Sequence, residues 1–347
     1  MVARARPMVA GGMLALGAAV AFGATTPLVQ RFGRGMGPFT TAALLYAGSA
    51  LFAVIPSGPR PAPLRRSDLP RLLSVTLLGA VLAPIALVWG LQRTSGVLAS
   101  LLLNLEALFT VILARLIWAE AIGPRVAAAL AATLAGGALL VFDGRATSAA
   151  AGWGALAVVL ATLGWAADGV IGRPLSERDP SQVVLGKGAL GALLSFGLSR
   201  AWGEAWPASF ASLALVGCGA IGYGVSLRMY LQAQRAVGAA RTGTVFAAAP
   251  FIGASVAWAM GEHAGGPATI AAALLCAVGV ALQLTEGHDH AHTHMAAGHD
   301  HAHRHDDGHH DHHHDVIPAG EHAHPHTHDG VTHTHAHGED SHHRHEH

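Results

Sequence analysis

The sequence contains little charge and almost no cysteine, lysine or asparagine. Asp, Glu, Lys and Arg together make up only 12% of its 347 residues, whereas 52% are hydrophobic. Such a composition excludes an intrinsically disordered protein and does not fit a soluble enzyme. The two cysteines, Cys218 and Cys276, both lie in apolar runs. Their placement excludes a disulfide framework and a cysteine-based metal site.

The formal net charge of zero is the sum of two unlike segments. Residues 1–286 carry 19 basic and 10 acidic side chains, and residues 287–347 carry 2 basic and 11 acidic ones. Of the 25 histidines, 24 lie in the second segment. The chain therefore consists of an apolar body and a polar, His-rich tail, which need separate interpretations.

The apolar body contains ten runs that are long enough for transmembrane helices. A bilayer core of about 30 Å needs roughly 20 apolar residues per helix. The first run continues through Thr25, Thr26 and Pro27 without a small-residue cleavage site, so we interpret it as a helix and not as a signal peptide. The expected spans are residues 8–29, 38–55, 71–91, 96–117, 125–142, 152–173, 182–201, 210–230, 240–260 and 267–284.

The distribution of arginine predicts the orientation of these spans. Basic residues in short loops favour the cytoplasmic side. With the N-terminus inside, thirteen arginines fall in inner segments and five in outer segments. An even number of spans then places the His-rich tail on the cytoplasmic side as well. We expect a multi-pass protein of a bacterial-type inner membrane, with the lipid bilayer as its constant partner.

The body repeats itself at an offset of 142 residues. Residues 8–143 form the first half and residues 152–286 the second, and each contains five predicted spans. An odd number of spans turns the second half upside down relative to the first, as in many secondary transporters. A duplicated helix bundle that only forms a scaffold is the alternative. The matches in register include Gly12 with Gly154, Arg31 with Arg173, Gly96 with Gly238, Phe109 with Phe251 and Glu120 with Glu262.

Two segments in register carry a resemblance to a known family. The runs LQRTSGVLASLLLNLEALFTVILARLIWAE (91–120) and AQRAVGAARTGTVFAAAPFIGASVAWAMGE (233–262) resemble the signature segments of the EamA domain of the drug/metabolite transporter superfamily. The resemblance covers residues 8–287. It implies two inverted five-helix repeats, ten spans, cytoplasmic termini and the movement of a small solute. It does not indicate which solute. The His-rich tail departs from the usual member, which ends soon after its tenth span.

Polar groups in the fourth span are candidates for transport and coupling. Glu106 lies at the middle of the span, whereas the matching position of the second half is Ala248. Burying an ionised side chain there costs roughly 2.5 to 3.5 kcal/mol on insertion scales, so Glu106 needs a partner or a cavity. It can exchange a proton or bind a cation, or it can act as a protonated hydrogen-bond partner in helix packing. Asn104 faces away from Glu106, which shares a face with Thr110.

Asp168 in the sixth span and Lys187 in the seventh form a second candidate pair. They lie almost equally far from the turn that joins these antiparallel spans, so we expect them at similar depth. Lys187 is the single lysine of the chain, which favours a place for a compact, titratable ammonium. A structural ion pair, or a lysine that reaches toward the membrane interface, is the simpler alternative.

Helix breakers and one aromatic residue are further candidates for the lining of a cavity. Thr25, Thr26 and Pro27 lie in the first span, and Pro250 lies in the ninth. Proline frees backbone carbonyls that can line a path, although a packing kink is the commoner outcome. Trp165 falls inside the sixth span and could contact a solute or pack in the core.

The tail combines imidazoles with carboxylates, without apolar periodicity, so we expect residues 287–347 to be disordered. Nitrogen and oxygen ligands suit zinc, nickel, cobalt or copper, and the sequence does not select among them. A metal buffer without a role in transport, a pH-sensitive tail and a composition without function are alternatives. The candidate metal ligands are His288, His290, His292, His294, His299, His301, His303, His305, His309, His310, His312, His313, His314, His322, His324, His326, His328, His333, His335 and His337.

These features together favour an all-α membrane protein that acts as a secondary transporter, with efflux as the expected direction. The tail would deliver or sense divalent metal. The solute is a small molecule or a metal ion, and a membrane-anchored metal buffer or sensor is the alternative function. We expect no catalytic residues, because the sequence offers no nucleophile with a base and no nucleotide loop. No cofactor is required and no nucleic acid is expected, and a homodimer is an open option.

Overall fold

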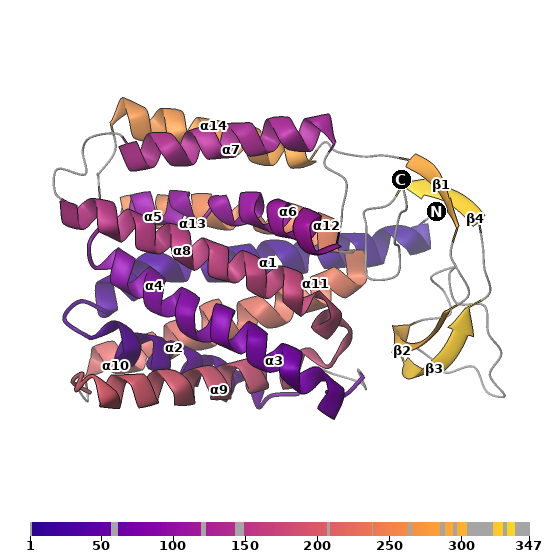
Figure 1. Ribbon diagram of the computed structural model, residues 1–347, viewed down its shortest axis with the longest axis horizontal. Helices are drawn as coiled ribbons and strands as arrows, with labels where there is room; N and C mark the ends of the chain where they lie inside the picture. The colour runs from indigo at the N-terminus through magenta and orange to yellow at the C-terminus, as the bar shows by residue number, and fades with distance from the viewer. Residues whose placement is uncertain are drawn as a thin grey trace.

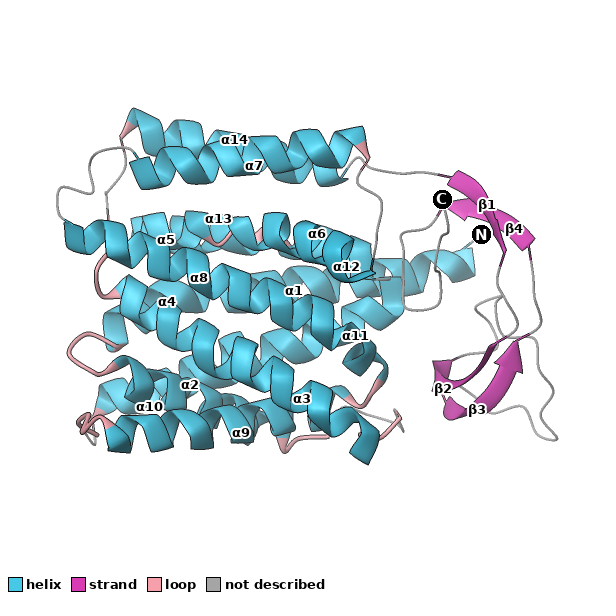
Figure 2. Cartoon of the chain, viewed as in Figure 1, coloured by secondary structure: helices cyan, strands magenta, loops and turns pink. Residues whose placement is uncertain are grey.

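The apolar body is a bundle of helices that run back and forth between two ends, as Figure 1 and Figure 2 show. The structure is a computed structural model. It describes residues 2–56, 62–118, 123–142, 149–206, 209–237, 239–262 and 266–284 of the body, and residues 289–293, 297–303, 322–328 and 332–336 of the tail.

The two halves contain corresponding helices. In the first half these are α1 (Val2–Phe32), α2 (Pro38–Ala53), η1 (Arg66–Asp68), α3 (Leu69–Val75), η2 (Thr76–Leu82), α4 (Ala83–Leu91), α5 (Gly96–Leu102), α6 (Leu105–Trp118) and α7 (Pro124–Phe142). In the second half they are α8 (Ala149–Gly172), η3 (Arg173–Glu177), α9 (Pro180–Ala201), α10 (Phe210–Cys218), η4 (Gly219–Val225), α11 (Ser226–Val237), α12 (Ala239–Phe246), α13 (Ala249–Ala259) and α14 (Pro267–Leu284). The segments η2 and η4 are π-helical.

Every predicted span coincides with helix, and six of the helical segments are long and apolar enough to cross a membrane. The chain is therefore a helical, multi-pass membrane protein, while a full count of ten spans stays a prediction. The six segments are Val9–Phe32, Arg66–Leu91, Gly96–Ile117, Ala150–Glu177, Pro180–Ala201 and Phe210–Ala236. The shorter apolar helices are Pro38–Ala53, Pro124–Leu140, Ala249–Ala259 and Pro267–Leu282.

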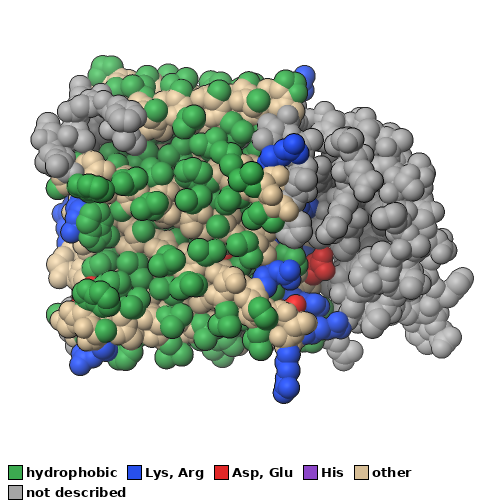
Figure 3. Space-filling model, viewed as in Figure 1, with side chains coloured by type: hydrophobic (Ala, Val, Ile, Leu, Met, Phe, Trp, Pro, Cys, Tyr) green, Lys and Arg blue, Asp and Glu red, His purple; other side chains and the backbone are tan. Residues whose placement is uncertain are grey.

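The surface of the bundle matches a lipid environment. Hydrophobic side chains cover the middle of the visible face, and Lys and Arg side chains gather toward its ends (Figure 3). Large apolar residues such as Leu116, Trp153 and Leu213 are more than half exposed. Such exposure is unfavourable in water and favourable against lipid.

Helix packing follows the internal repeat. α1 packs against α11 and α13, and the corresponding helix of the second half, α8, packs against α4 and α6. α2 packs against its own counterpart α9, and α7 packs against its counterpart α14, with which it forms the upper pair in Figure 1. The pairs are those that a two-fold relation between the halves requires.

Small residues allow the closest of these contacts. At Gly188 in α9, a Cβ atom would lie 2.8 Å from the backbone nitrogen of Ala50 in α2. Close backbone approach through small residues is the usual way in which helices associate in lipid. Gly197, nine residues further along α9, has no heavy atom within 4 Å of such a position, so the two glycines of one helix have different roles.

We predict that Gly188→Leu destabilises the protein, whereas Gly197→Leu does not. Overpacking of a close contact costs about 1–3 kcal/mol, because the backbones must separate. Thermal denaturation of the two purified variants in the same detergent, followed by size-exclusion chromatography, measures the difference. Equal midpoints for both variants would contradict the assigned contact between α2 and α9.

The described residues of the tail form four short strands, and the expected disorder of the tail as a whole stays a prediction. β1 (Asp289–Thr293) pairs antiparallel with β4 (Thr332–Ala336), and β2 (Ala297–His303) pairs with β3 (His322–His328). The sequence alternates His with another residue in these segments, and a period of two fits a strand. The strands lie beyond the end of the bundle at which α1 begins (Figure 1).

Candidate functional site

The fourth and ninth helical segments are interrupted inside the bundle. α5 and α6 are separated by a turn at Leu103 and Asn104, and α12 and α13 are separated by a turn at Ala247 and Ala248. α5 has 7 residues and α12 has 8, and each precedes the longer piece. The segments run in opposite directions, so the two breaks lie at similar distances from opposite ends. Broken helices of this kind form the solute sites of many inverted-repeat transporters.

Different residues cause the two breaks. The Asn104 side-chain nitrogen donates to the Leu101 carbonyl at 2.9 Å, which gives the backbone an alternative to the helix. Pro250 lies in the first turn of α13, where its missing N–H costs least. The Asn104 side-chain oxygen and the Ser100 hydroxyl are buried without a hydrogen-bond partner, so the first break presents unused polar groups.

The third and eighth segments contain π-helical turns at matching positions. η2 begins at Thr76 and η4 at Gly219, which are 143 positions apart. π-turns leave backbone groups without their usual helical partners and occur often at functional sites. The Gly79 carbonyl in η2 accepts hydrogen bonds from the Tyr46 hydroxyl at 2.6 Å and from the Trp165 indole at 2.9 Å.

Asp168 and Lys187 form the predicted ion pair. The Lys187 ammonium lies 2.7 Å and 2.6 Å from the two carboxylate oxygens of Asp168. Lys187 is only 6% exposed. A side chain at Gly79 would overlap the Asp168 carboxylate, so a glycine in the π-turn is what lets the pair lie against η2.

Glu106 lies in the first turn of α6, directly after the break. Its backbone N–H donates to the Leu103 carbonyl at 3.0 Å. Its carboxylate makes no hydrogen bond or ion pair with any residue that the structure describes, although its charge interacts with Asp168 and with the Tyr230 hydroxyl. The sequence separates Glu106 from the Asp168 pair, whereas packing of α6 against α8 brings them into one cluster. Thr110, one turn further along α6, is half-buried.

Aromatic rings from several helices meet beside this cluster. Tyr230 packs on Phe246 at 5.0 Å between centroids, and Phe246 packs on Phe22 at 5.7 Å. Phe22 in turn contacts Trp165 at 5.6 Å and Tyr223 at 5.9 Å. Tyr46 continues the series, 5.4 Å from Tyr223. Only Trp165 is predicted from the sequence, because an aromatic residue within an apolar run carries no signal of its neighbours.

The predicted breakers of the first segment do not interrupt it. α1 continues through Pro27 to Phe32. Thr25 and Thr26 are buried, and their hydroxyls donate to the Phe22 carbonyl at 2.8 Å and 3.5 Å. Thr25 lies directly against Gly222 of η4. These residues support packing of α1 against the eighth segment, beside the aromatic rings.

Comparison with known proteins assigns the chain to a family. The model of the EamA-like transporter family matches residues 9–142 and 152–285, once for each half. The chain belongs to the EamA-like transporter family. An "Uncharacterized transporter" of Methanothermobacter thermautotrophicus is 28% identical over 262 residues, which are 70% of this chain and 76% of that protein. A crystal structure described only as that of a protein shares the fold, with a TM-score of 0.58 at 19% identity over 81% of this chain and 97% of the other.

Family membership identifies a membrane transporter, which points away from an enzyme. The two matched regions agree closely with the halves expected from the internal repeat. The breaks, the π-turns and the Glu106 cluster of this EamA protein lie where the two matched regions pack together.

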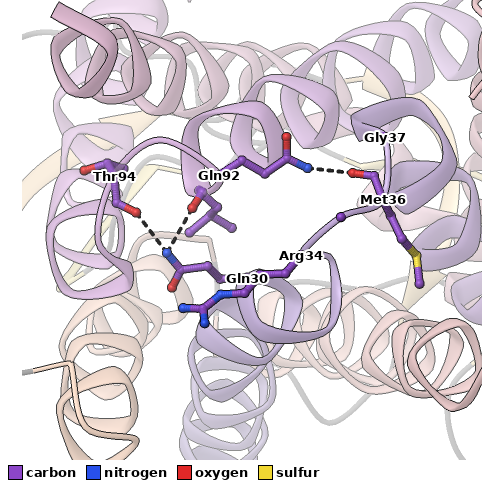
Figure 4. A pocket seen from close by; sticks show the side chains of 8 residues that line it. Gln30, Arg34, Met36, Gly37, Gln92 and Thr94 are labelled. Atoms are coloured by element: carbon purple, nitrogen blue, oxygen red, sulfur yellow. Dashed lines mark hydrogen bonds between the residues drawn. The ribbon is translucent and has the colours of Figure 1, made fainter. Parts of the chain in front are cut away.

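One end of this EamA protein carries a polar cavity of about 590 Å³, between the end of α1 and the end of α4 (Figure 4). Gln30 donates to the carbonyls of Leu91 and Thr94 at 2.9 Å each, and Gln92 donates to the Met36 carbonyl at 2.8 Å. Arg34 also lines the cavity. No pattern in the sequence marks this cavity, which lies at the predicted outer end.

The opposite end is held by arginines. Arg178 forms an ion pair with Asp68 at 2.9 Å, and Arg235 donates to the Ser176 carbonyl at 3.0 Å and to the Arg178 carbonyl. Arg228 donates to the Ile55 carbonyl. These contacts join the ends of α2, α9 and α11 at the predicted cytoplasmic side.

We predict that the Asp168 and Lys187 substitutions are not additive. Asp168→Asn or Lys187→Met alone leaves one buried charge and costs about 3–5 kcal/mol, whereas the double variant leaves none. Thermal midpoints of the three purified variants and the wild type form the double-mutant cycle. A double variant less stable than both single variants would contradict the assigned pair.

Proposed function

We propose that this EamA protein is a secondary transporter that exports a small organic solute from the cytoplasm in exchange for protons. Glu106 is the coupling residue. The observation that carries the proposal is the Glu106 carboxylate, which has no ion-pair partner in the part of the chain that the structure describes and lies at the break of a helix inside the bundle. Such a group can be neutralised by a proton or by a cationic solute, and each supports exchange across a membrane.

The paired charges support this role for Glu106. The Asp168 carboxylate is occupied by Lys187, so it is already compensated. Glu106 is the remaining acid of the cluster and interacts with Asp168 as a like charge. An acid without a counter-charge inside the bundle can be neutralised by a proton or by a bound cation.

The ligand chemistry inside the bundle favours an organic solute over a transition metal. Transition metals take several nitrogen, oxygen or sulfur ligands at one point. Among the residues described, no group of three His, Cys, Asp or Glu side chains is placed to hold a metal ion. The cluster offers aromatic rings and one free carboxylate, which suit an organic molecule.

The tail is proposed to bind divalent transition metal on the cytoplasmic side and to sense it. Strand register supports the idea, because histidines stand opposite one another. His299 pairs with His326 and His301 with His324 in β2 and β3, and His290 pairs with His335 in β1 and β4. The register therefore brings histidines of two strands to opposite positions, and nitrogen ligands suit zinc, nickel, cobalt or copper.

The proposed cytoplasmic location of the tail is supported by the predicted topology and by the arrangement of the chain. The prediction places both termini on the cytoplasmic side, and the start of α1 and the tail strands lie at one end of the bundle (Figure 1). An exported solute enters the protein from the cytoplasm. A tail on that side can bind cytoplasmic metal and act on the end of the bundle at which the solute enters.

We predict that Glu106→Gln abolishes solute-driven proton movement. Everted membrane vesicles with an imposed pH gradient are challenged with single solutes, namely a quaternary ammonium, an amino acid, a dicarboxylate and a sugar. At least one solute collapses the gradient, reported by a pH-sensitive dye, only with the wild-type protein. Glu177→Gln is the matched control, because Glu177 lies in η3, outside the cluster. Equal responses of the two variants would reject Glu106 as the coupling residue.

We predict that the paired histidines bind metal more tightly than other histidines of the tail. Substitution of His299, His301, His324 and His326 by Ala lowers the affinity for zinc and nickel, because each pair loses both ligands. Substitution of the same number of histidines at 309, 310, 312 and 313 is the matched control. Calorimetric titration of zinc and nickel measures the affinity of the two purified variants, the wild-type protein and a chain that ends at Gly287. Metal binding unchanged by loss of the whole tail would reject the proposal.

A further inference from the structure

Polar groups on α5 are spaced along the way from the outer cavity to the break of the fourth segment. Thr94 lines the cavity, Gly96 begins α5, and Ser100 lies one turn further on the same face. Asn104 continues this spacing into the turn that ends α5. Ser100 is 0% exposed and Asn104 is 4% exposed. Among the residues that the structure describes, neither the Ser100 hydroxyl nor the Asn104 side-chain oxygen has a hydrogen-bond partner.

The helices α1 and α13 close over the middle of this row. A Cβ atom at Gly253 in α13 would lie 2.8 Å from the Ser100 hydroxyl oxygen and 3.0 Å from the Gly23 carbonyl oxygen in α1. Three helices therefore meet at this point without room for a methyl group. The Gly23 carbonyl also lacks its usual helical donor, because Pro27, four residues further on, has no N–H. The closed contact thus holds polar groups whose hydrogen-bonding capacity is not fully used.

Glu262 fastens the outer end of the same three helices. It follows the end of α13, and its carboxylate accepts a hydrogen bond from the Gly96 N–H at 2.6 Å. A Cβ atom at Gly96 would lie 2.9 Å from that carboxylate and 2.6 Å from the side-chain oxygen of Gln30 in α1. Hydrogen bonds to a charged group are roughly twice as strong as neutral ones. A glycine at position 96 therefore lets one strong contact join α13 to the start of α5, beside α1.

Both residues of this contact recur in the internal repeat. Gly96 corresponds to Gly238, and Glu262 corresponds to Glu120. The matching residues Gly238 and Glu120 lie outside the described residues. The polar groups at the break have not been kept in this way, since Glu106 corresponds to Ala248. The glycine and the glutamate are thus features of both halves, which fits a role in a movement of the framework and not in the choice of a solute.

We propose that α1, α5 and α13 form the outer gate of the transporter, and that the hydrogen bond between Glu262 and Gly96 keeps this gate closed. Separation of α13 from α5 breaks this bond and opens Ser100 and Asn104 to the outer cavity. The released polar groups then bond to water or to the solute, which offsets part of the lost contact. The inference goes beyond the proposed function, because it holds for any solute and any coupling ion.

Thiol accessibility from outside the cell tests the gate. Ser100→Cys is a reporter of similar size, and the native Cys218 and Cys276 are buried. Cells that produce the full-length protein are treated with a membrane-impermeant methanethiosulfonate, and the rate of labelling is measured by mass spectrometry. Labelling is expected to be slow with Glu262 and about tenfold or more faster with Glu262→Ala, because loss of a hydrogen bond to a charged group favours the open state. Protein without the reporter measures labelling of the native cysteines.

Glu204→Ala is the matched control for Glu262→Ala. The Glu204 carboxylate accepts from the Phe39 and Thr40 N–H groups at the start of α2, at 3.3 Å and 2.7 Å. This contact is of the same kind and lies at the same end, but it does not involve α1, α5 or α13. Faster labelling with Glu262→Ala alone supports the gate. An equal increase with both variants, or no increase with either, overturns it.

A second pair of variants tests the closure without changing Glu262. The methyl group of Gly253→Ala overlaps the Ser100 and Gly23 oxygens in the closed contact, so labelling of the reporter is expected to rise several-fold. Gly217→Ala is the control, since a Cβ atom there has no heavy atom within 4 Å. Unchanged labelling with Gly253→Ala overturns closure at this point. Size-exclusion profiles exclude misfolded variants. The assay needs no transported solute, so its outcome does not depend on the proposed coupling role of Glu106.

Discussion

Backbone polar groups have no water to bond inside a bilayer, and this constraint shapes the whole site. A continuous helix satisfies them, so each departure from α-helix needs a local partner. The departures here fall in four helical segments, at η2, η4 and the two breaks. The Gly79 carbonyl receives Tyr46 and Trp165, and the Leu101 carbonyl receives Asn104. Polar side chains therefore lie where backbone carbonyls lack their usual helical hydrogen bonds.

The same constraint governs the charges. Lys187 is tolerated inside the bundle because Asp168 lies within 2.7 Å of its ammonium. The pair occupies space that only a glycine at position 79 leaves open. A neutral pair joins α8 to α9, which both pack on η2, and it leaves Glu106 as the charge proposed to take part in coupling. Asp168 thus stabilises the structure through its ion pair, whereas Glu106 is the acid of the same cluster that is proposed to act in transport.

The sequence predicts the framework well, because hydrophobic length, arginine distribution and the repeat are properties of single segments. It also predicts the Asp168–Lys187 pair, because both residues lie at equal distances from one turn. It does not predict that Glu106 lies near Asp168, since that contact depends on how α6 crosses α8. Tyr46 and Gly79 carry no signal, because a tyrosine or a glycine in an apolar run looks like packing. Histidine alternates with other residues in the tail, which is the period of a β-strand. Because these segments lack apolar residues, the sequence does not predict which strands pair.

Duplication explains why the backbone is symmetric while the site is not. Both halves keep a π-turn and a broken helix within one or two residues of the matching positions. The side chains differ at those positions, since Glu106 corresponds to Ala248, Asn104 to Phe246 and Trp165 to Gly23. An acid at position 248 as well would add a second charge inside the bundle that needs a partner of its own. With Glu106 in the first half and alanine at the matching position of the second, the break carries one acid. Duplication therefore supplied two similar backbones, and substitution of side chains made the two halves chemically different.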